Sequence, residues 1–386
     1  MKEKNSYNVF KISLLFVFLG SIISCNNSTV SNNSVAPSAC QLEIINSLPN
    51  NLVIAHRGTT FYAPEETEEA MRWARNVGAD YLEFDLQRTK DGYLIALHDE
   101  RLVRTTDVNV KFPTRINNPV SSFTYKELLT LDAGSWFNEV NSKKAKISFI
   151  GLDILTLEDI IHIAEGKKIK RDSIGKRITK INKGRIITVY EEDQTDNGNR
   201  PGVYIETKVP ELFLNIENDL KRELIKLGWY NNDVSKLKKI HTFNNKVKWA
   251  NSKNRVFLQT FSKESLIRLN KTFKRKIPIC FLLWRGNEKG DIPDDKLETF
   301  QKWIEFGIQN GASVIGPSIG GLPNNYVNLL DDKHFEIIRK YNLKIHAYSF
   351  DTRIQMKEYN KKVNGMFSNK ANEALFFYQN KVFRFD

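Results

Sequence analysis

The sequence predicts an α/β fold, a TIM (β/α)8 barrel, on three observations. From Asn51 onward, short apolar runs alternate with stretches of helical periodicity through about eight units, which is typical of a parallel sheet with crossover helices. The chain of 386 residues is long enough for one such barrel. Ionisable residues gather where the apolar runs end, and in a parallel barrel all of those ends open on one face. A doubly wound parallel sheet is the alternative.

The elements follow one another in order. The expected strands are LVIAH (52–56), YLEFDLQ (81–87), YLIALHD (93–99), GVYIETK (202–208), VFLQTF (256–261), ICFLLW (279–284), SVIGP (313–317), KIHAYSF (344–350) and GMFS (365–368). The expected helices include TEEAMRWARNVG (67–78), ELFLNIENDLKRELIKLG (211–228), KESLIRLNKTF (263–273), KLETFQKWIEFGIQNG (296–311) and DKHFEIIRKYN (332–342). Their apolar residues recur at helical spacing, and the first two end at a glycine, a common helix terminator.

Two segments interrupt this rhythm after the strand that ends in His98-Asp99. Residues 100–165 predict an insertion with short helices, and residues 166–201 predict a second excursion with a hairpin around RIITVY. The first part of that excursion, 166–185, is rich in lysine and arginine. A solvated basic loop is the simplest interpretation, and contact with an anionic envelope or lipid surface is the alternative.

The N-terminus differs from the rest of the chain. Residues 1–24 begin with lysines and continue into an apolar run that is short for a membrane span and has the form of a signal peptide. The sequence IISC, which ends at Cys25, resembles the lipobox of bacterial lipoproteins and implies a lipid on that sulfur. A plain secretory signal or a single transmembrane anchor is the alternative. Residues 25–50 open with a Ser/Asn-rich stretch and predict a flexible tether to a barrel domain at 51–386.

These features narrow the location and the partners. The protein is expected to be exported and lipid-anchored to a bacterial cell envelope, on its periplasmic or cell-surface side. The formal net charge of +13 would suit nucleic acid, but exported proteins rarely meet nucleic acid, so no such partner is expected. Cys40 and Cys280 can pair in an oxidising compartment. Because Cys40 lies in the tether and Cys280 in an apolar strand, two free thiols are expected instead.

Candidate site residues lie at the carboxyl ends of the expected strands, which a barrel brings together. They are His56, Arg57, Glu83, Asp85, His98, Glu206, Lys208, Gln259 and Tyr348. Glu83 and Asp85 stand two apart on one strand, so their side chains point the same way and repel each other unless a cation lies between them. With Glu206 as a third carboxylate and no cysteine nearby, they indicate a hard divalent cation, with Ca²⁺ in first place and Mg²⁺ as the alternative.

The other candidates supply acid–base groups and positive charge. His56 and His98 suit a base-and-acid pair, because an unperturbed imidazole titrates near neutral pH. Arg57 and Lys208 can hold phosphate oxygens. A divalent cation, two histidines and two basic side chains together suit attack on a phosphodiester.

These residues stand in motifs that resemble those of the glycerophosphodiester phosphodiesterases. The motifs are AHRG (55–58), APEET (63–67), GADYLEFDLQRTKDG (78–92), LHD (97–99), RTT (104–106), LDAGSWF (131–137), LTLEDI (155–160), VYIETK (203–208) and LQTFS (258–262). The resemblance implies a TIM barrel with a small insertion after the His-Asp strand. It also implies metal-dependent hydrolysis of small glycerophosphodiesters to sn-glycerol 3-phosphate and an alcohol.

The resemblance further implies roles for single residues. They are an acid/base pair (His56 and His98), metal ligands (Glu83, Asp85 and Glu206) and groups that bind phosphate or substrate (Arg57, Lys208, Gln259 and Tyr348). In the mechanism it implies, the substrate's own glycerol hydroxyl attacks phosphorus, and water then opens the cyclic phosphate.

Three positions depart from the family pattern. Glu66 stands where the family has Asn, Tyr348 stands in place of a Trp, and Ser368-Asn369 replaces a Thr-Asp pair. Two other functions stay open. One is a phospholipase-type phosphodiesterase that acts on lyso- or intact phospholipids, although no hydrophobic finger is visible near the mouth. The other is a non-catalytic barrel that binds polyol phosphates, although no candidate histidine or carboxylate has been lost.

Overall fold

Eight parallel strands close into a barrel in the computed structural model, which describes residues 35–230, 249–288 and 290–378 of one compact unit. The barrel closes because β1 pairs with both β13 and β2. In order around the barrel, the strands are β1 (Leu52–Ala55), β2 (Tyr81–Arg88), β8 (Gly202–Thr207), β9 (Val256–Thr260), β10 (Ile279–Leu283), β11 (Val314–Pro317), β12 (Lys344–Phe350) and β13 (Gly365–Ser368). The predicted TIM barrel is confirmed, and the doubly wound alternative, an open sheet, is excluded.

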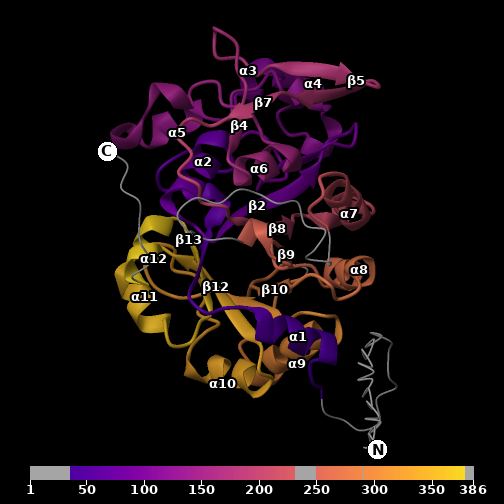
Figure 1. Ribbon diagram of the computed structural model, residues 1–386. Coiled ribbons are helices and arrows are strands. Elements are labelled where there is room, and N and C mark those ends of the chain that lie inside the picture. The colour runs from indigo at the N-terminus through magenta and orange to yellow at the C-terminus, as the bar shows by residue number, and fades with distance from the viewer. Residues whose placement is uncertain (1–34, 231–248, 289, 379–386) are drawn as a thin grey trace, which may run out of the picture. The chain divides into compact units, whose positions relative to one another are not determined.

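One helix follows each barrel strand along the chain. These helices are α2 (Glu68–Val77), α6 (Leu157–Ala164), α7 (Ile216–Lys226), α8 (Lys263–Phe273), α9 (Leu297–Gln309), α10 (Asp332–Lys340), α11 (Arg353–Tyr359) and α12 (Ala371–Phe377). Figure 1 shows them one after another around the strands. Each presents an apolar face to the sheet, which buries the outward side chains of the strands in one hydrophobic core.

The strand expected at 93–99 is not a barrel strand. β3 (Leu94–Ala96) pairs antiparallel with the end of β2, and Leu97 N then donates to Asp85 O over 2.9 Å. His98 therefore follows a short ribbon that leads back to the mouth of the barrel. The expectation was wrong because alternating apolar residues are the same in a barrel strand and in an antiparallel ribbon.

The chain between β3 and β8 holds the two excursions. Residues 100–165 form α3 (Val108–Lys111), α4 (Tyr125–Leu128), α5 (Ser135–Val140) and the helix α6. Because α6 packs against α2, β2 and β8, it belongs to the helix ring rather than to the insertion. The second excursion pairs β4 (Lys167–Ile169) with β7 (Tyr190–Glu192), and β5 (Thr179–Asn182) with β6 (Arg185–Thr188) in a hairpin that contains RIIT.

The basic segment 166–185 is mostly exposed, as expected of a solvated segment, but it forms β4 and the β5–β6 hairpin instead of an irregular loop. Arg177 is buried and lies 2.8 Å from Asp159 on α6. Arg171 lies 2.7 Å from Glu68 on α2. These ion pairs connect the segment to the ring of helices.

A second group of ion pairs, here called the arginine clasp, ties the end of this excursion to α2. It consists of Arg72, Arg75, Asp193 and Asp196. Both Asp193 oxygens accept hydrogen bonds from Arg72, at 2.7 and 2.8 Å, and Arg75 Nη2 donates to Asp193 Oδ2 over 2.5 Å. Arg75 Nε lies 3.3 Å from Asp196 Oδ1. Each charge in the clasp has an opposite partner, and the clasp extends to Arg200, which donates to Asp196, and to Glu69, which pairs with Arg72.

Residues 39–47 were expected to be part of a flexible tether but form a helix, α1 (Ala39–Ser47). The Ser38 and Gln41 side chains form a capping box at its start. The amide of Gln41 donates to the carbonyl oxygens of Ile308 and Ala312, both over 2.9 Å, and Ile45 is buried. The tether prediction is therefore wrong for this part of the chain.

The predicted signal peptide (1–24) and Cys25 lie outside the described residues. Among the helices that the structure describes, none combines the length and apolar character needed to cross a membrane. Cys280 is a buried free thiol on β10, so the expectation of a free thiol is confirmed for this residue.

Candidate active site

Strand alternation builds a polar layer inside the barrel above an aromatic one. The Tyr81 ring faces inward and packs against Tyr204 and Phe257, with ring centroids 5.9 and 5.3 Å apart. The residues two positions further along these three strands point the same way, so Glu83, Glu206 and Gln259 also face the interior, nearer the carboxyl ends. Asp85 lies opposite Glu206 in the register of β2 and β8.

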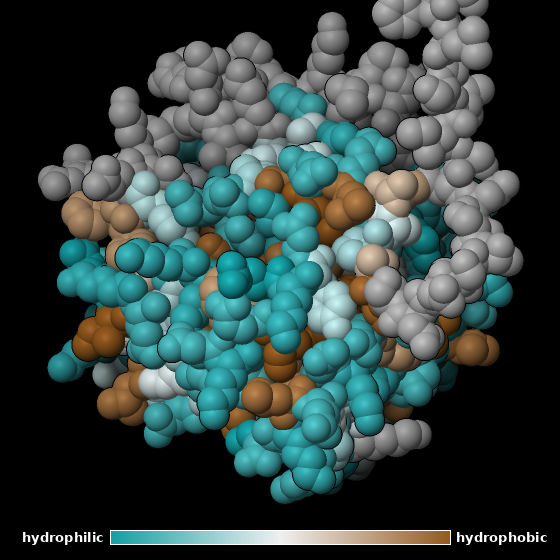
Figure 2. Space-filling view, turned by 90° about the horizontal axis from the view of Figure 1, so that it is seen from below, coloured by the Kyte–Doolittle hydropathy of each residue, from teal (hydrophilic) through white to brown (hydrophobic). Residues whose placement is uncertain are grey.

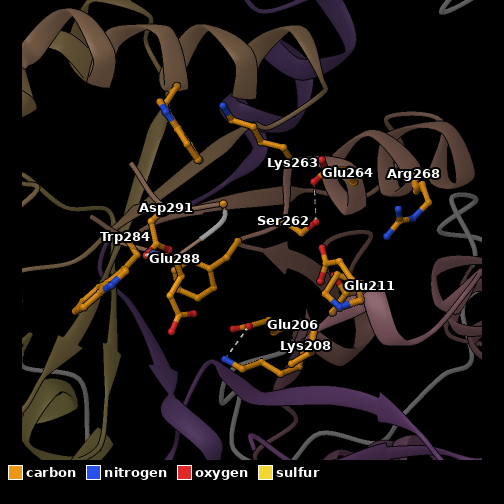
Figure 3. Close-up of a pocket in the computed structure, with 16 residues that line it drawn as sticks. Glu206, Lys208, Glu211, Ser262, Lys263, Glu264, Arg268, Trp284, Glu288 and Asp291 are labelled. Atoms are coloured by element: carbon orange, nitrogen blue, oxygen red, sulfur yellow. Dashed lines mark hydrogen bonds and ion pairs between the residues drawn. The ribbon is translucent and has the colours of Figure 1, made fainter. Parts of the chain in front are cut away.

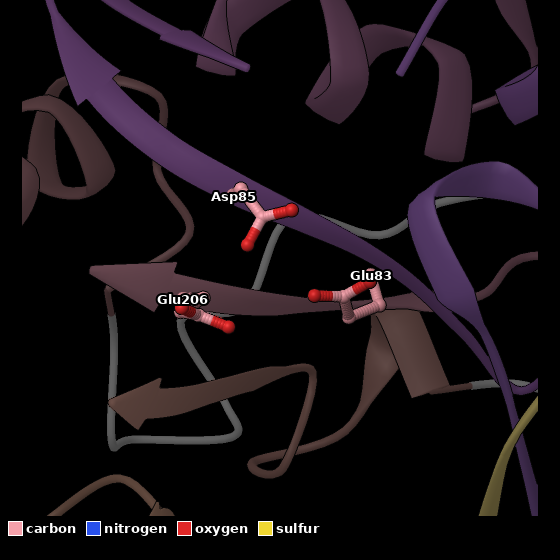
Figure 4. A group of neighbouring side chains, drawn as sticks. All are labelled: Glu83, Asp85 and Glu206. Atoms are coloured by element: carbon pink, nitrogen blue, oxygen red, sulfur yellow. The ribbon is translucent and has the colours of Figure 1, made fainter. Parts of the chain in front are cut away.

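Glu83, Asp85 and Glu206, here called the acidic cluster, converge at this level. One carboxylate oxygen of each lies within 4.8 Å of the others, and all three side chains are buried. Figure 4 shows the two β2 carboxylates and the β8 carboxylate pointing toward one another. The sequence placed these three residues together, and the structure brings them together.

Two cations border the acidic cluster. Lys208 Nζ lies 3.1 Å from Glu206 Oε1 and 3.6 Å from Asp85 Oδ1. Arg57 Nε lies 3.1 Å from Asp85 Oδ2, and the Arg57 backbone N donates to Glu83 Oε2 over 2.8 Å. The predicted phosphate-binding pair therefore lies beside the carboxylates, at the level where the barrel opens.

Burial and mutual repulsion set the protonation of the acidic cluster. Burial raises the pKa of Glu83 well above its usual value, and the carboxylates of Asp85 and Glu206 raise it further. Burial also raises the pKa of Glu206 to about 7, although Lys208 opposes the rise. For Asp85 the nearby positive charges, Lys208 foremost, outweigh burial and lower the pKa below its usual value. The pKa values of Glu83 and Glu206 are therefore raised first by burial and then by the neighbouring carboxylates.

The acidic cluster fits a divalent metal ion. Its donors are carboxylate oxygens, which Ca²⁺ and Mg²⁺ prefer. Asp85 Oδ2 is buried and makes an ion pair with Arg57 Nε at 3.1 Å, but it accepts no hydrogen bond within the part of the chain that the structure describes. The buried triad can therefore hold a divalent metal ion.

The turn after β1 orients two groups of the site, the Arg57 amide and the His56 side chain. Arg57, Gly58 and Thr59 have φ angles of 49°, 75° and 68°, three left-handed residues in a row. A side chain at position 58 would meet the backbone of Ala70 at 2.9 Å. This tight turn directs the Arg57 amide at Glu83 and leaves His56 at the mouth.

His56 is held through its Nδ1 atom. Asn369 Oδ1 lies 2.6 Å from His56 Nδ1 and also accepts from Thr60 Oγ1 over 2.9 Å. Because an amide oxygen can only accept, His56 Nδ1 carries the proton and Nε2 keeps its lone pair. Burial, reinforced by Arg57, lowers the pKa of His56 to about 3. The imidazole is therefore neutral at pH 7, as a proton acceptor must be.

His98 has a charged partner instead. Its Nδ1 atom lies 2.6 Å from Asp99 Oδ1, and Arg104 Nε donates to Asp99 Oδ2 over 2.6 Å. Burial lowers the pKa of His98, while the charge of Asp85 and the hydrogen bond to Asp99 oppose that fall. A carboxylate behind the ring favours the protonated imidazole more than an amide does. The partner of His98 therefore favours the protonated ring of an acid, whereas the partner of His56 favours the neutral ring of a base.

The last two candidates lie in the wall of the site. Gln259 Nε2 donates to Glu83 Oε1 over 2.8 Å, so this amide orients a member of the acidic cluster. Tyr348 OH donates to Leu283 O over 2.7 Å, and its ring meets Phe261 edge to face. Tyr348 thus supports the wall from behind Phe261.

A cavity of about 760 Å³ opens beside the acidic cluster. Figure 3 shows Glu206 and Lys208 on one side of it, with Trp284, Glu288 and Asp291 on another. Phe261 and Trp303 add apolar surface. A ligand that reaches the acidic cluster therefore has room for a second group of moderate size.

The structure adds three residues to the candidates. The Glu66 side chain is buried and accepts from Asp85 N over 2.6 Å, so it fixes the backbone under the acidic cluster. Asn369 and Thr60 orient His56. Glu66 and Asn369 were noticed only as departures from the family pattern, and no sequence signal connected either to these contacts.

Family and protein comparisons agree with this geometry. The model of the glycerophosphoryl diester phosphodiesterase family matches residues 56–185. The chain is 28% identical over 306 residues to glycerophosphodiester phosphodiesterase of Bacillus subtilis (strain 168), which covers 79% of this chain and 78% of that protein. It is 25% identical over 347 residues to glycerophosphodiester phosphodiesterase of Haemophilus influenzae, covering 84% of this chain and 85% of that protein.

A solved structure is similar in fold. The phosphodiesterase of Oleispira antarctica in complex with the product sn-glycerol-3-phosphate superposes with a TM-score of 0.55 at 18% identity, covering 86% of this chain and 98% of that one. The segment matched by the family model carries His56, Glu83, Asp85 and His98. The comparisons support the expected resemblance to the glycerophosphoryl diester phosphodiesterase family.

Proposed function

We propose that this chain hydrolyses glycerophosphodiesters to sn-glycerol 3-phosphate and an alcohol. One observation carries the proposal: two differently partnered histidines and a buried acidic cluster share one barrel mouth in a chain that resembles this family. Two relatives named glycerophosphodiester phosphodiesterase match most of this chain, and a structural neighbour holds sn-glycerol-3-phosphate. A non-catalytic barrel would have no use for this set of groups.

We further propose that Glu83, Asp85 and Glu206 hold Ca²⁺, with Mg²⁺ as the weaker alternative. Three buried carboxylates that converge from two rigid strands support a hard cation with several oxygen ligands. When bound, such an ion would neutralise charge on the phosphate oxygens. Arg57 and Lys208 lie where they can bind the same oxygens.

The two histidines divide the proton transfers. His56 Nε2 accepts the proton of the glycerol hydroxyl as its oxygen attacks phosphorus, and Asn369 holds the ring in the required tautomer. As the bond between phosphorus and the alcohol oxygen breaks, His98 gives its proton to that oxygen. Water then opens the cyclic phosphate, with the two histidines in reversed roles. The cavity beside the acidic cluster receives the departing alcohol group.

An assay of purified protein on glycerophosphocholine, with and without chelator, tests this function. We expect equal amounts of choline and glycerol 3-phosphate, loss of activity in EDTA, and recovery with Ca²⁺ in excess. Activity that survives both EDTA and the substitution His56→Ala would contradict the mechanism. Turnover of lysophospholipids alone would favour a phospholipase-type enzyme, and no turnover at all would favour a binding barrel.

We also propose that the mature protein is exported and carries a lipid on Cys25, on the strength of the N-terminal sequence alone. Labelled fatty acid fed to expressing bacteria should enter the protein. The substitution Cys25→Ser should abolish the label, whereas Cys280→Ser should leave it. Labelling that persists in Cys25→Ser would contradict the lipid anchor.

A further inference from the structure

One loop of the insertion exposes large apolar side chains. Residues 138–151, here called the insertion tip, read NEVNSKKAKISFIG. Val140, Ile147 and Ile150 keep 70%, 89% and 62% of their surface exposed. Single exposed apolar residues scattered among polar ones are ordinary, and the face in Figure 2 has that pattern. Three within eleven positions of one loop are less ordinary and point to a surface that something covers.

The insertion tip is held in this shape by its own contacts. Asn138 and Lys146 exchange two hydrogen bonds, Nδ2 to O over 2.8 Å and N to Oδ1 over 2.9 Å. Phe149 is buried and its ring packs against Phe137 with centroids 5.5 Å apart. Because the loop is closed and anchored, the isoleucines on either side of Phe149 are directed outward.

The same loop is basic. It carries Lys143, Lys144 and Lys146 against one acidic residue, Glu139. Lys144 Nζ donates to Phe61 O over 2.6 Å and lies 3.7 Å from the Phe61 ring centroid. Lys143 and Lys146 are exposed. Apolar side chains interleaved with lysines are typical of segments that lie on an anionic bilayer.

The insertion tip also lies beside the mouth of the barrel. Phe61, which Lys144 contacts, donates its backbone N to Asn369 O over 3.2 Å. Asn369 is the residue that holds His56. Three consecutive contacts therefore connect the tip with the candidate base, so a surface that covers the tip lies close to the entrance.

We propose that the insertion tip docks on the surface of an anionic phospholipid bilayer, with Ile147 and Ile150 entering the headgroup region and Lys143 and Lys146 facing lipid phosphates. A second copy fits less well, because paired tips would bring like-charged lysines together. The proposal goes beyond the catalytic function, because it concerns the position of the barrel mouth relative to a bilayer and not the choice of diester. The sequence shows no continuous hydrophobic finger here, because lysines interrupt the apolar residues.

Local hydrogen exchange on the full chain tests the proposal. Total vesicle binding is unsuitable, because the apolar run Ile12–Ile23 could bind any bilayer. We expect amides within 138–151 to exchange more slowly with phosphatidylglycerol/phosphatidylcholine vesicles than with phosphatidylcholine vesicles or buffer. High salt should reduce this protection.

Two matched double variants sharpen the experiment. I147S/I150S should lower the protection of the tip by about tenfold or more, while hydrolysis of soluble glycerophosphocholine stays at the wild-type rate. I174S/I181S removes two isoleucines that are 83% and 80% exposed in the basic second excursion, and should leave the protection unchanged.

Four results would overturn the proposal. The tip could show no protection, or equal protection with both kinds of vesicle. Alternatively, I174S/I181S could lose binding while I147S/I150S keeps it, which would place the docking surface on the second excursion. Protection that appears without vesicles and grows with protein concentration would assign the tip to a second copy of the chain.

Discussion

The acidic cluster and the arginine clasp are both buried groups of charge, but among the described residues two arginines meet two carboxylates in the clasp, whereas two cations meet three carboxylates in the acidic cluster. In the clasp, both oxygens of Asp193 accept hydrogen bonds from guanidinium groups, which outweigh burial and lower the pKa of Asp193. In the acidic cluster, the pKa values of Glu83 and Glu206 are raised. The pKa of Asp193 is lowered because its guanidinium partners outweigh burial, whereas the pKa values of Glu83 and Glu206 are raised because burial and neighbouring carboxylates outweigh their positive partners.

The largest expected difference concerns activity. Asp85→Asn keeps the shape of the side chain but removes a charge from the acidic cluster, so we expect kcat/KM to fall at least about a thousandfold. Ca²⁺ should raise the Tm of the wild type but not of this variant. Steady-state kinetics and thermal unfolding with and without Ca²⁺ measure both effects. A variant that still gains Tm with Ca²⁺ would show that the ion binds elsewhere.

A substitution in the clasp should lower the stability of the fold and leave activity unchanged. Asp193→Asn leaves the guanidinium groups of Arg72 and Arg75 without their shared carboxylate, so we expect the free energy of unfolding to fall by about 3 kcal/mol. kcat/KM and the Ca²⁺ response should stay close to wild type. Urea unfolding monitored by fluorescence gives the stability. If activity fell with stability intact, the clasp would belong to the site and not to the scaffold.

A substitution of His56 tests the proton transfer separately from cation binding by the acidic cluster. His56→Gln removes the lone pair of Nε2 but no charge, so we expect kcat/KM to fall about a hundredfold. The Ca²⁺-dependent gain in Tm should persist, in contrast to Asp85→Asn. Loss of both properties in His56→Gln would mean that the histidine helps to bind the cation.

The smallest effects are opposite slopes of stability with pH. The pKa of Glu206 is raised to about 7 in the metal-free fold, so the stability it contributes is present below its unfolded pKa of about 4.3 and is lost as the pH rises toward 7. Asp193 has a lowered pKa, so its contribution is present above about pH 4 and is lost as the pH falls further. Urea unfolding in EDTA across this range should show both slopes. Glu206→Gln should reduce the first slope and Asp193→Asn the second.

The sequence predicted most of the barrel and the centre of the site, because both depend on short-range rules. Residues two apart on a strand share a face, which was enough to place Glu83 and Asp85 together. The capping signal of Ser38 and Gln41 could have revealed α1, but the Ser/Asn-rich stretch before it suggested a tether.

Other features depend on contacts that no local pattern encodes. Asn369 meets His56 across 313 positions of the chain. The pairing of β3 was missed because strand alternation does not specify the partner strand or its direction. Tertiary contacts of this kind, together with the burial that shifts each pKa, require the folded structure.

The turn after β1 limits which residues position 58 can accept. Gly58 takes part in no chemistry, yet any side chain there would combine an unfavourable φ of 75° with a close approach to Ala70. The resulting shift would move His56 and the Arg57 amide together. A saturation library selected for activity should therefore reject every replacement at position 58 as firmly as it rejects replacements at the histidine two positions before it.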